Sequence, residues 1–187
     1  MNFQTQIPTA AVLGPALLIF ALFALARRRG NAPGWRGGPL VLRVVLALYV
    51  GAVLSITIFP LWIYGGIYRN EAPWTNQIQL IPLLMADVTM IPNVVMFVPL
   101  GFLLPLLCHR LTGARTVAFC ALASLGIELA QLLQYIALGN GRAVDINDLI
   151  ANTFGGLLGY AALRTVRRTA AARAALKKSS RSPSTGL

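Results

Sequence analysis

Carboxylates and carboxamides between residues 124 and 152 are the groups in this chain whose types and spacing could do chemistry. Three of the five acidic residues of the sequence lie there, namely Glu128, Asp145 and Asp148. An Asp, Lys or Arg at the centre of a membrane helix costs about 2.5–3.5 kcal/mol on insertion scales, and it generally faces a protein interior or a water-filled cavity. Because the surrounding sequence is strongly apolar, we expect these groups to form a functional site.

Helical spacing places these polar side chains on shared helix faces. Ser124, Glu128, Gln131 and Tyr135 follow the spacing i, i+4, i+7, i+11, which puts them along one face of a helix. Asp145, Asp148 and Asn152 follow the spacing i, i+3, i+7, which also places them on one helix face. Asn93 and Arg142 lie at the same membrane depth in the predicted topology. The sequence therefore predicts one outward-opening polar pocket that brings together Asn93, Glu128, Gln131, Arg142, Asp145, Asp148 and Asn152.

Two kinds of chemistry fit this set. Glu128, Asp145 and Asp148 supply hard oxygen ligands of the type that Mg²⁺ or Ca²⁺ takes, and a protonated Glu128 could act as a general acid. Arg142 could instead contact an anionic head group. No nucleophile–base pair is recognisable, and the single histidine, His109, lies at the other end of the predicted helices. The sequence leaves open whether any reaction is catalysed, and it assigns no cofactor.

Each residue also has a structural explanation. Asp145 fits a helix N-cap, with Asp148 answering it in a capping-box-like pair. Gln131 and Asn152 could hydrogen-bond across helices as packing contacts. An ion pair with Arg142 would satisfy Glu128. Gly155, Gly156 and Gly159 predict close helix packing rather than chemistry.

Composition indicates an integral membrane protein. The 187 residues are 57% hydrophobic and 11% charged, whereas a soluble domain is typically about 25% charged. The mean hydropathy is +0.69. The net charge of +11 comes from basic residues placed between apolar segments, which argues against a nucleic-acid-binding face.

Apolar runs predict an all-α, polytopic membrane bundle of about five transmembrane helices. The expected spans cover residues 9–26, 40–62, 92–107, 116–138 and 149–163. Residues 65–91 form the longest non-spanning segment, and its apolar piece, Ile78 to Met85, is too short to cross and is expected to lie at or dip into the outer interface. Residues 1–39 then form a first helix and a basic turn, residues 40–163 the main membrane domain, and residues 164–187 a basic, disordered cytoplasmic tail.

The distribution of Lys and Arg predicts the orientation. Fourteen of the sixteen fall at one end of these helices, and only Arg69 and Arg142 fall at the other. The positive-inside rule then places the N-terminus outside and the C-terminus in the cytoplasm of a multi-pass cell-membrane protein. Cys108 and Cys120 lie near the cytoplasmic side, where we expect them to be reduced.

The order of these polar residues resembles a known family. The pattern Ser124-x3-Glu128-x2-Gln131, followed by Arg142-x2-Asp145-x2-Asp148-x3-Asn152-x2-Gly155-x3-Gly159, is similar to the VanZ-like family of membrane proteins. Asn93 to Gly101 matches its N-x3-F-x-P-x-G element, and Leu80-Ile81-Pro82-Leu83 resembles its N-L-I-P-F element, with Gln79 and Leu83 departing from it. The resemblance covers roughly Val41 to Leu163. It implies a role in the cell envelope that involves the lipoglycopeptide teicoplanin or its cell-wall target.

Two functions are therefore carried forward. The first is binding or modification of an envelope lipid, a lipid-linked cell-wall precursor or a lipoglycopeptide antibiotic in an outward-facing polar pocket. The second is a metal-dependent membrane phosphotransferase or hydrolase that acts on a lipid (pyro)phosphate. The bilayer is the expected partner in both, and the sequence gives no oligomeric state.

Overall fold

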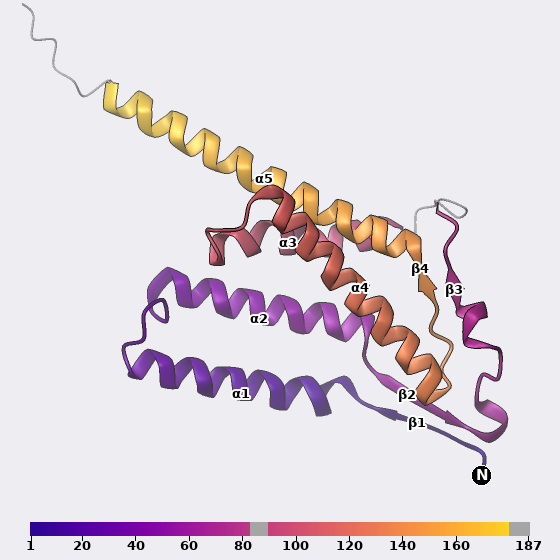
Figure 1. The fold of residues 1–187 in the computed structure, drawn as a ribbon. Helices are drawn as coiled ribbons and strands as arrows, with labels where there is room; N and C mark the ends of the chain where they lie inside the picture. Colours follow the sequence, from indigo (N-terminus) through magenta and orange to yellow (C-terminus); the bar gives the residue numbers. More distant parts are fainter. Residues whose placement is uncertain (83–89, 180–187) are drawn as a thin grey trace, which may run out of the picture.

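The computed structural model describes residues 1–82 and 90–179 and consists mainly of five helices (Figure 1). They are α1 (Thr9–Arg29), α2 (Gly37–Thr57), α3 (Met90–Leu107), α4 (Gly113–Leu138) and α5 (Ile146–Ser179). Helices α1 to α4 are each long and apolar enough to cross a membrane. The prediction of an all-α membrane bundle is confirmed.

Helix α5 differs from the predicted fifth span in both length and polarity. It begins with Asn147, Asp148 and Asn152 in its first two turns, and it is not among the four described helices that meet both spanning criteria. It also continues from Arg164 to Ser179, where the sequence predicted a disordered tail. Residues 164–179 are rich in Ala, Arg and Lys, which are strong helix formers, so the helix extends past its apolar part.

Helices α3 and α5 make the most extensive contact between elements. Glycines allow this close approach. A Cβ on Gly155 or Gly159 would overlap the backbone carbonyls of Val94 and Val98 on α3, and a Cβ on Gly101 would overlap the backbone of Gly156. The predicted role of the glycines in close helix packing is confirmed.

Helix α2 ends at Thr57, before the predicted limit near Trp62. Pro60 follows shortly after, and proline lacks the N–H that a continuing helix would need and disfavours helical backbone in the residue before it. The chain then enters strand β2 (Leu61–Gly65), which pairs antiparallel with β1 (Phe3–Ile7). The sequence did not predict this pairing.

A second short sheet joins the loop after β2 to the start of α5. Two 3₁₀ turns (Gly66–Tyr68 and Trp74–Gln77) lead into β3 (Ile78–Gln79), which pairs parallel with β4 (Val144–Asp145). The predicted interfacial segment therefore begins as a strand beside Asp145. Its end, Leu83 to Met85, lies outside the described residues, as does Asp87.

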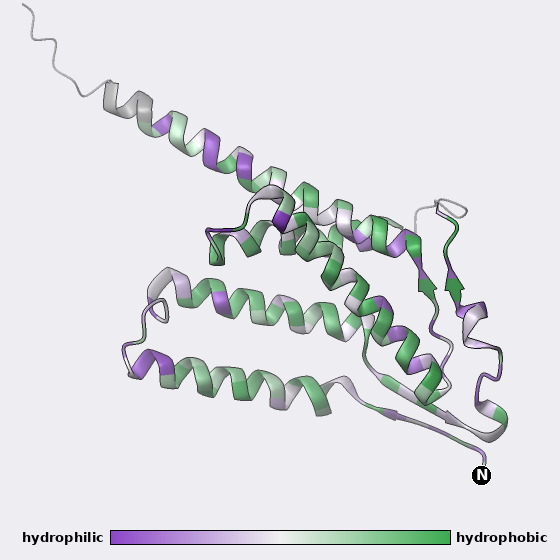
Figure 2. Cartoon of the chain, in the orientation of Figure 1, coloured by the Kyte–Doolittle hydropathy of each residue, from purple (hydrophilic) through white to green (hydrophobic). Residues whose placement is uncertain are grey.

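The two ends of the molecule differ in character (Figures 1 and 2). The strands and the α4–α5 connection lie at one end, whereas the α1–α2 turn and the distal part of α5 lie at the other. Figure 2 shows hydrophilic residues at the C-terminal end of α1 and along distal α5, with mostly hydrophobic helix between the ends. This arrangement agrees with the separation of basic residues on which the orientation was predicted.

Candidate functional site

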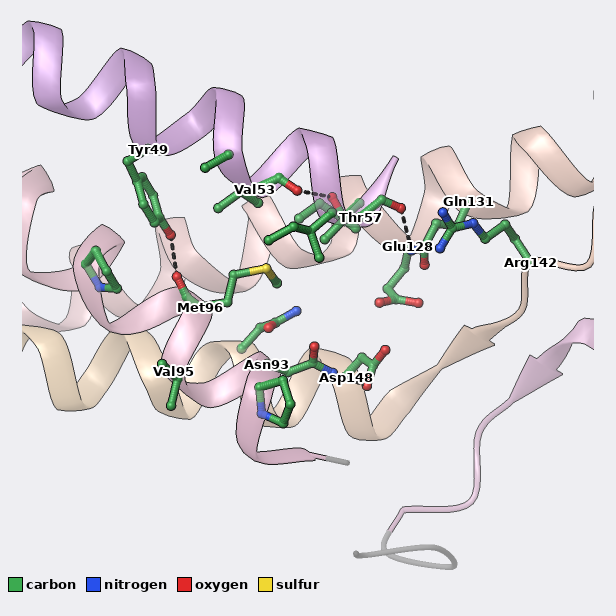
Figure 3. Close-up of a pocket in the computed structure, with 16 residues that line it drawn as sticks. Tyr49, Val53, Thr57, Asn93, Val95, Met96, Glu128, Gln131, Arg142 and Asp148 are labelled. Carbon is green, nitrogen blue, oxygen red and sulfur yellow. Dashed lines mark hydrogen bonds between the residues drawn. The ribbon is translucent and has the colours of Figure 1, made fainter. Parts of the chain in front are cut away.

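A pocket of about 550 Å³ lies among α2, α3, α4 and the start of α5. Figure 3 shows side chains from all four elements facing a common space. Of the seven residues predicted to form the polar site, the structure places six on its lining: Asn93, Glu128, Gln131, Arg142, Asp148 and Asn152. Only Asp145 is not part of the lining.

The rest of the lining is mostly apolar and includes the gap between α2 and α3. Val53, Ile56, Val95, Met96 and Pro99 contribute to it. Ile56 is 69% exposed and Val95 is 62% exposed, so the pocket opens sideways toward the surface that lipid tails would cover. Near the middle of the two helices, the Tyr49 hydroxyl donates to the Met96 carbonyl at 2.6 Å, which closes that end of the gap. The pocket is thus polar at one end and apolar along its walls.

Glu128 is held in place from the start of α5. Its side chain is 3% exposed, and its Oε2 accepts a hydrogen bond from the backbone N–H of Asp145 at 3.2 Å. Between the two described residues Glu128 and Arg142 there is no ion pair, so the salt-bridge explanation for Glu128 is wrong. Figure 3 shows the Glu128 carboxylate directed toward Asp148, with Arg142 reaching in near Gln131.

Asp145 acts as the N-cap of α5. Its Oδ1 accepts the backbone N–H of Asn147 at 2.8 Å, and the helix begins at Ile146. The N-cap explanation of Asp145 is confirmed, and its side chain is used structurally. The reciprocal half of the expected capping box comes from a different helix. Glu128 on α4, not Asp148, accepts the Asp145 N–H.

Asp148 and Asn152 carry the polar wall formed by α5. The Asn93 side-chain amide donates to Asp148 Oδ1, which joins α3 to α5. The Asn152 amide donates to the Ser124 hydroxyl at 2.9 Å, which joins α5 to α4. Asn152 is 2% exposed, and among the described residues its Oδ1 has no hydrogen-bond partner. Among the described residues, the Asn152 side-chain oxygen is therefore a buried acceptor on the pocket lining that the fold does not pair.

The polar face of α4 continues toward the strand end. Gln131 Nε2 donates to the carbonyl of Thr57 at 3.0 Å, where α2 ends. The Tyr135 hydroxyl contacts the Ala72 carbonyl and Asn70 Oδ1 in the loop after β2. The predicted alignment of these residues with Glu128 is confirmed, but Tyr135 anchors the loop after β2 and does not line the pocket.

Sequence reasoning missed the residues that position the α4–α5 connection. Gln134 donates to the carbonyl of Ile58 at 3.3 Å, and Asn140 donates to Gln134 Oε1 at 3.3 Å. Asn140 Oδ1 in turn accepts the backbone N–H of Arg142 at 3.1 Å. This series fixes where Arg142 enters the pocket. The signal in the sequence was the amide pair just before and just after the end of α4.

Tyr49 and Thr57 on α2 were also missed. Both line the pocket, and they lie eight residues apart, which places them on one helix face. Polar side chains on the same face of an apolar span were the available signal.

The metal-ligand candidates do not form one group. In residues 1–82 and 90–179, no three His, Cys, Asp or Glu side chains are close enough together to hold a metal ion. Glu128 and Asp148 share the pocket, whereas Asp145 points its carboxylate at the α5 backbone. The described residues thus offer two carboxylates, supplemented by amide oxygens.

Comparisons with known proteins agree with the motif pattern. The family model described as VanZ/LLP1 matches residues 46–167, which include every residue of the pocket lining. A curated protein named "Protein VanZ", from Enterococcus faecium, is 31% identical over 129 residues, which is 65% of this chain and 73% of that protein. No solved structure matches this chain. The match leaves out α1, the start of α2 and the distal part of α5, and it includes all the residues that line the pocket: the chain belongs to the VanZ/LLP1 family.

Proposed function

We propose that the pocket binds the head group of an amphiphilic envelope molecule while the apolar part of that molecule extends through the gap between α2 and α3. The observation that carries this proposal is that the pocket combines a polar end with apolar walls. A cluster of buried polar side chains occupies one end, and exposed apolar side chains frame a lateral opening. A purely polar ligand would not need the apolar walls, and a purely apolar one would leave the polar cluster unpaired.

The polar end supports a ligand that offers both donors and acceptors. Glu128, Asp148 and Asn152 Oδ1 present acceptors, which suit sugar hydroxyls or an ammonium group. The Arg142 guanidinium presents donors of fixed geometry, which suit a phosphate or carboxylate. A lipid that carries sugar and phosphate groups satisfies both requirements. A pocket of about 550 Å³ lies within the range of about 300–1,000 Å³ that is usual for ligand sites.

Lipid-linked cell-wall precursors and lipoglycopeptides of the teicoplanin type are the ligand classes that fit this chemistry. Both combine carbohydrate with a long apolar chain. The family relationship supports an envelope role. The predicted orientation supports the outer face as the location of the polar end of the pocket. Binding to either class would give tolerance to a teicoplanin-type antibiotic, by sequestering the drug or by protecting its target.

A photocrosslinking amino acid at the pocket opening tests the proposal. Val95 is 62% exposed and lines the opening, whereas Leu122 is 65% exposed on α4 and does not line this pocket. A crosslinker at Val95 should capture an amphiphile with a sugar or phosphate head group, and one at Leu122 should capture bulk phospholipid only. Identical lipid profiles at the two positions would contradict a selective site.

The metal-dependent phosphotransferase or hydrolase is the alternative activity for the same pocket. One feature favours it, because Glu128 and Asp148 both reach the same space. A bound lipid (pyro)phosphate beside Arg142 would then be a substrate. The two activities separate experimentally: binding alone leaves the captured lipid intact, and hydrolysis releases phosphate only when a divalent metal is present.

A further inference from the structure

A second cleft lies at the other end of the bundle, between α1 and α2. Leu17, Phe20, Leu25, Val44, Ala47 and Leu48 line its walls, and its volume is about 430 Å³. The two helices lie side by side (Figure 1), and the cleft continues past Arg28 and Leu40 into a cavity that Arg36 also lines. An apolar groove therefore leads to two arginines. It lies almost wholly outside the part of the chain that the family model matches.

The arginines of the α1–α2 turn divide into two groups. The guanidinium of Arg27 lies over the ring of Phe23, and that of Arg43 lies over Trp35 and donates to the carbonyls of Gly34 and Pro39. These two stabilise the turn itself. The side chains of Arg28 and Arg36, by contrast, make no hydrogen bond, ion pair or ring contact with any described residue. Arg28 lines the cleft, Arg36 lines the adjoining cavity, and both guanidinium groups are available to a ligand.

No acidic residue in this part of the chain can neutralise them. The first 70 residues contain no Asp or Glu. Two available guanidinium groups beside an apolar groove are complementary in charge and polarity to a lipid with an anionic head group. Basic pockets between transmembrane helices on the cytoplasmic side commonly bind such lipids.

We infer that this cleft binds an anionic phospholipid of the cytoplasmic leaflet, with Arg28 and Arg36 on the phosphate and the acyl chains along the α1–α2 groove. Arginine suits this role because its planar fork pairs with phosphate oxygens at two points. The bound lipid fills the space between α1 and α2, which contact each other far less than α3 and α5 do. The α1–α2 pair then depends on lipid for part of its packing.

Native mass spectrometry of the full-length protein tests this inference. After delipidation, the protein is titrated with phosphatidylglycerol and with phosphatidylcholine of the same acyl chains. We expect phosphatidylglycerol to bind more tightly, and the Arg28→Gln/Arg36→Gln variant to lose on the order of tenfold in that affinity. Equal binding of the two lipids, or equal binding by the variant, would overturn the inference.

Two controls isolate the site. Arg29→Gln/Arg110→Gln removes the same charge from exposed positions that line neither cavity, and it should keep the full affinity for phosphatidylglycerol. Loss of affinity in this control equal to that in the cleft variant would reduce the effect to net charge and contradict a defined site. Ala47→Phe fills the groove while keeping both arginines, and it should also weaken binding. Inorganic phosphate at a matched concentration should not displace bound phosphatidylglycerol, since it lacks the acyl chains.

Discussion

Glu128 and Asp148 are held by single hydrogen bonds that their amide analogues can reproduce. Glu128 accepts one backbone N–H, and Asp148 accepts one amide from Asn93. A Gln or Asn oxygen accepts the same bond, so the fold does not need the negative charge at either position. What the charge adds is the strength of any contact with a ligand, because a hydrogen bond to a charged group contributes about 1.5–3 kcal/mol against about 0.5–1.5 kcal/mol for a neutral one.

We therefore predict that Glu128→Gln and Asp148→Asn leave the protein inserted and folded but abolish any tolerance to teicoplanin that it confers. Ligand affinity should fall by roughly tenfold to a hundredfold, which corresponds to the loss of one charged contact. Susceptibility assays measure the tolerance, and thermal unfolding of the purified variants measures whether they remain folded. Glu71→Gln is the matched control, since Glu71 is exposed and lies outside the pocket. Full tolerance in both pocket variants would show that the polar pocket is not the site.

The two carboxylates in the pocket also allow a prediction about metal binding. Mg²⁺ and Ca²⁺ sites usually combine carboxylates with several further oxygen ligands. Within the described residues, no three acidic, His or Cys side chains lie close enough together to hold a metal ion. We expect Mg²⁺, Mn²⁺ and Ca²⁺ to leave the thermal unfolding midpoint of the wild-type protein unchanged. A midpoint that rises with metal in the wild type but not in Glu128→Gln would favour the metal-dependent activity instead.

At the scale of elements, the pocket depends on how closely α3 and α5 pack. Gly155 and Gly159 face the backbone of α3, and Asn93 reaches Asp148 only because the two helices are in this close contact. A methyl group at either glycine would push the helices apart and force a rearrangement of the polar wall.

Gly155→Ala and Gly159→Ala should each destabilise the protein by about 1–3 kcal/mol, the usual cost of overpacking, and should weaken ligand binding as well. Gly126→Ala supplies the control. Gly126 lies within α4 with no atom within 4 Å of the added Cβ, so alanine there should be neutral or stabilising by up to about 1 kcal/mol. Thermal unfolding in detergent compares the three variants. Equal effects at Gly126 and Gly155 would contradict the close packing of α3 against α5.

Apolar runs predicted most of the bundle, and helix periodicity predicted which residues line the candidate site, because 3.6-residue spacing decides which side chains share a face. It could not give the partners across helices. The Asp145 N–H bond to Glu128, for example, depends on how α4 and α5 cross. The β1–β2 and β3–β4 pairs were equally inaccessible, since they join segments about 60 residues apart with no strong alternation of their own. Helix α5 was predicted too short because apolarity was used to mark its end, whereas the Ala-rich sequence continues the helix.

At the scale of the whole molecule, the orientation in the membrane decides which compartment each site faces. Of the fifteen basic residues in the part of the chain that the structure describes, thirteen lie toward the end that carries the α1–α2 turn and distal α5, and Arg69 and Arg142 lie at the strand end. The positive-inside rule predicts that the polar pocket faces outward and that the α1–α2 cleft faces the cytoplasm. The two proposed lipid sites would then bind lipids from opposite leaflets of the membrane.

Cysteine accessibility tests this orientation. Cys108 is exposed in the α3–α4 connection, and Gly141 lies in the α4–α5 connection, where an added Cβ would meet open space. A membrane-impermeant maleimide should label Cys108→Ser/Gly141→Cys in intact cells. It should label wild-type Cys108 only after permeabilisation. The reverse pattern would place the pocket at the cytoplasmic face and remove the basis for an extracellular ligand.

The central claim is that Glu128 and Asp148 hold the head group of an envelope amphiphile, and the molecule that co-purifies with the protein tests it most directly. Mass spectrometry of mildly solubilised wild-type protein is compared with that of the Glu128→Gln/Asp148→Asn double variant. We predict a lipid with a sugar or phosphate head group that is bound stoichiometrically to the wild type and is depleted at least tenfold in the variant. The same species at the same occupancy in both proteins would contradict the claim.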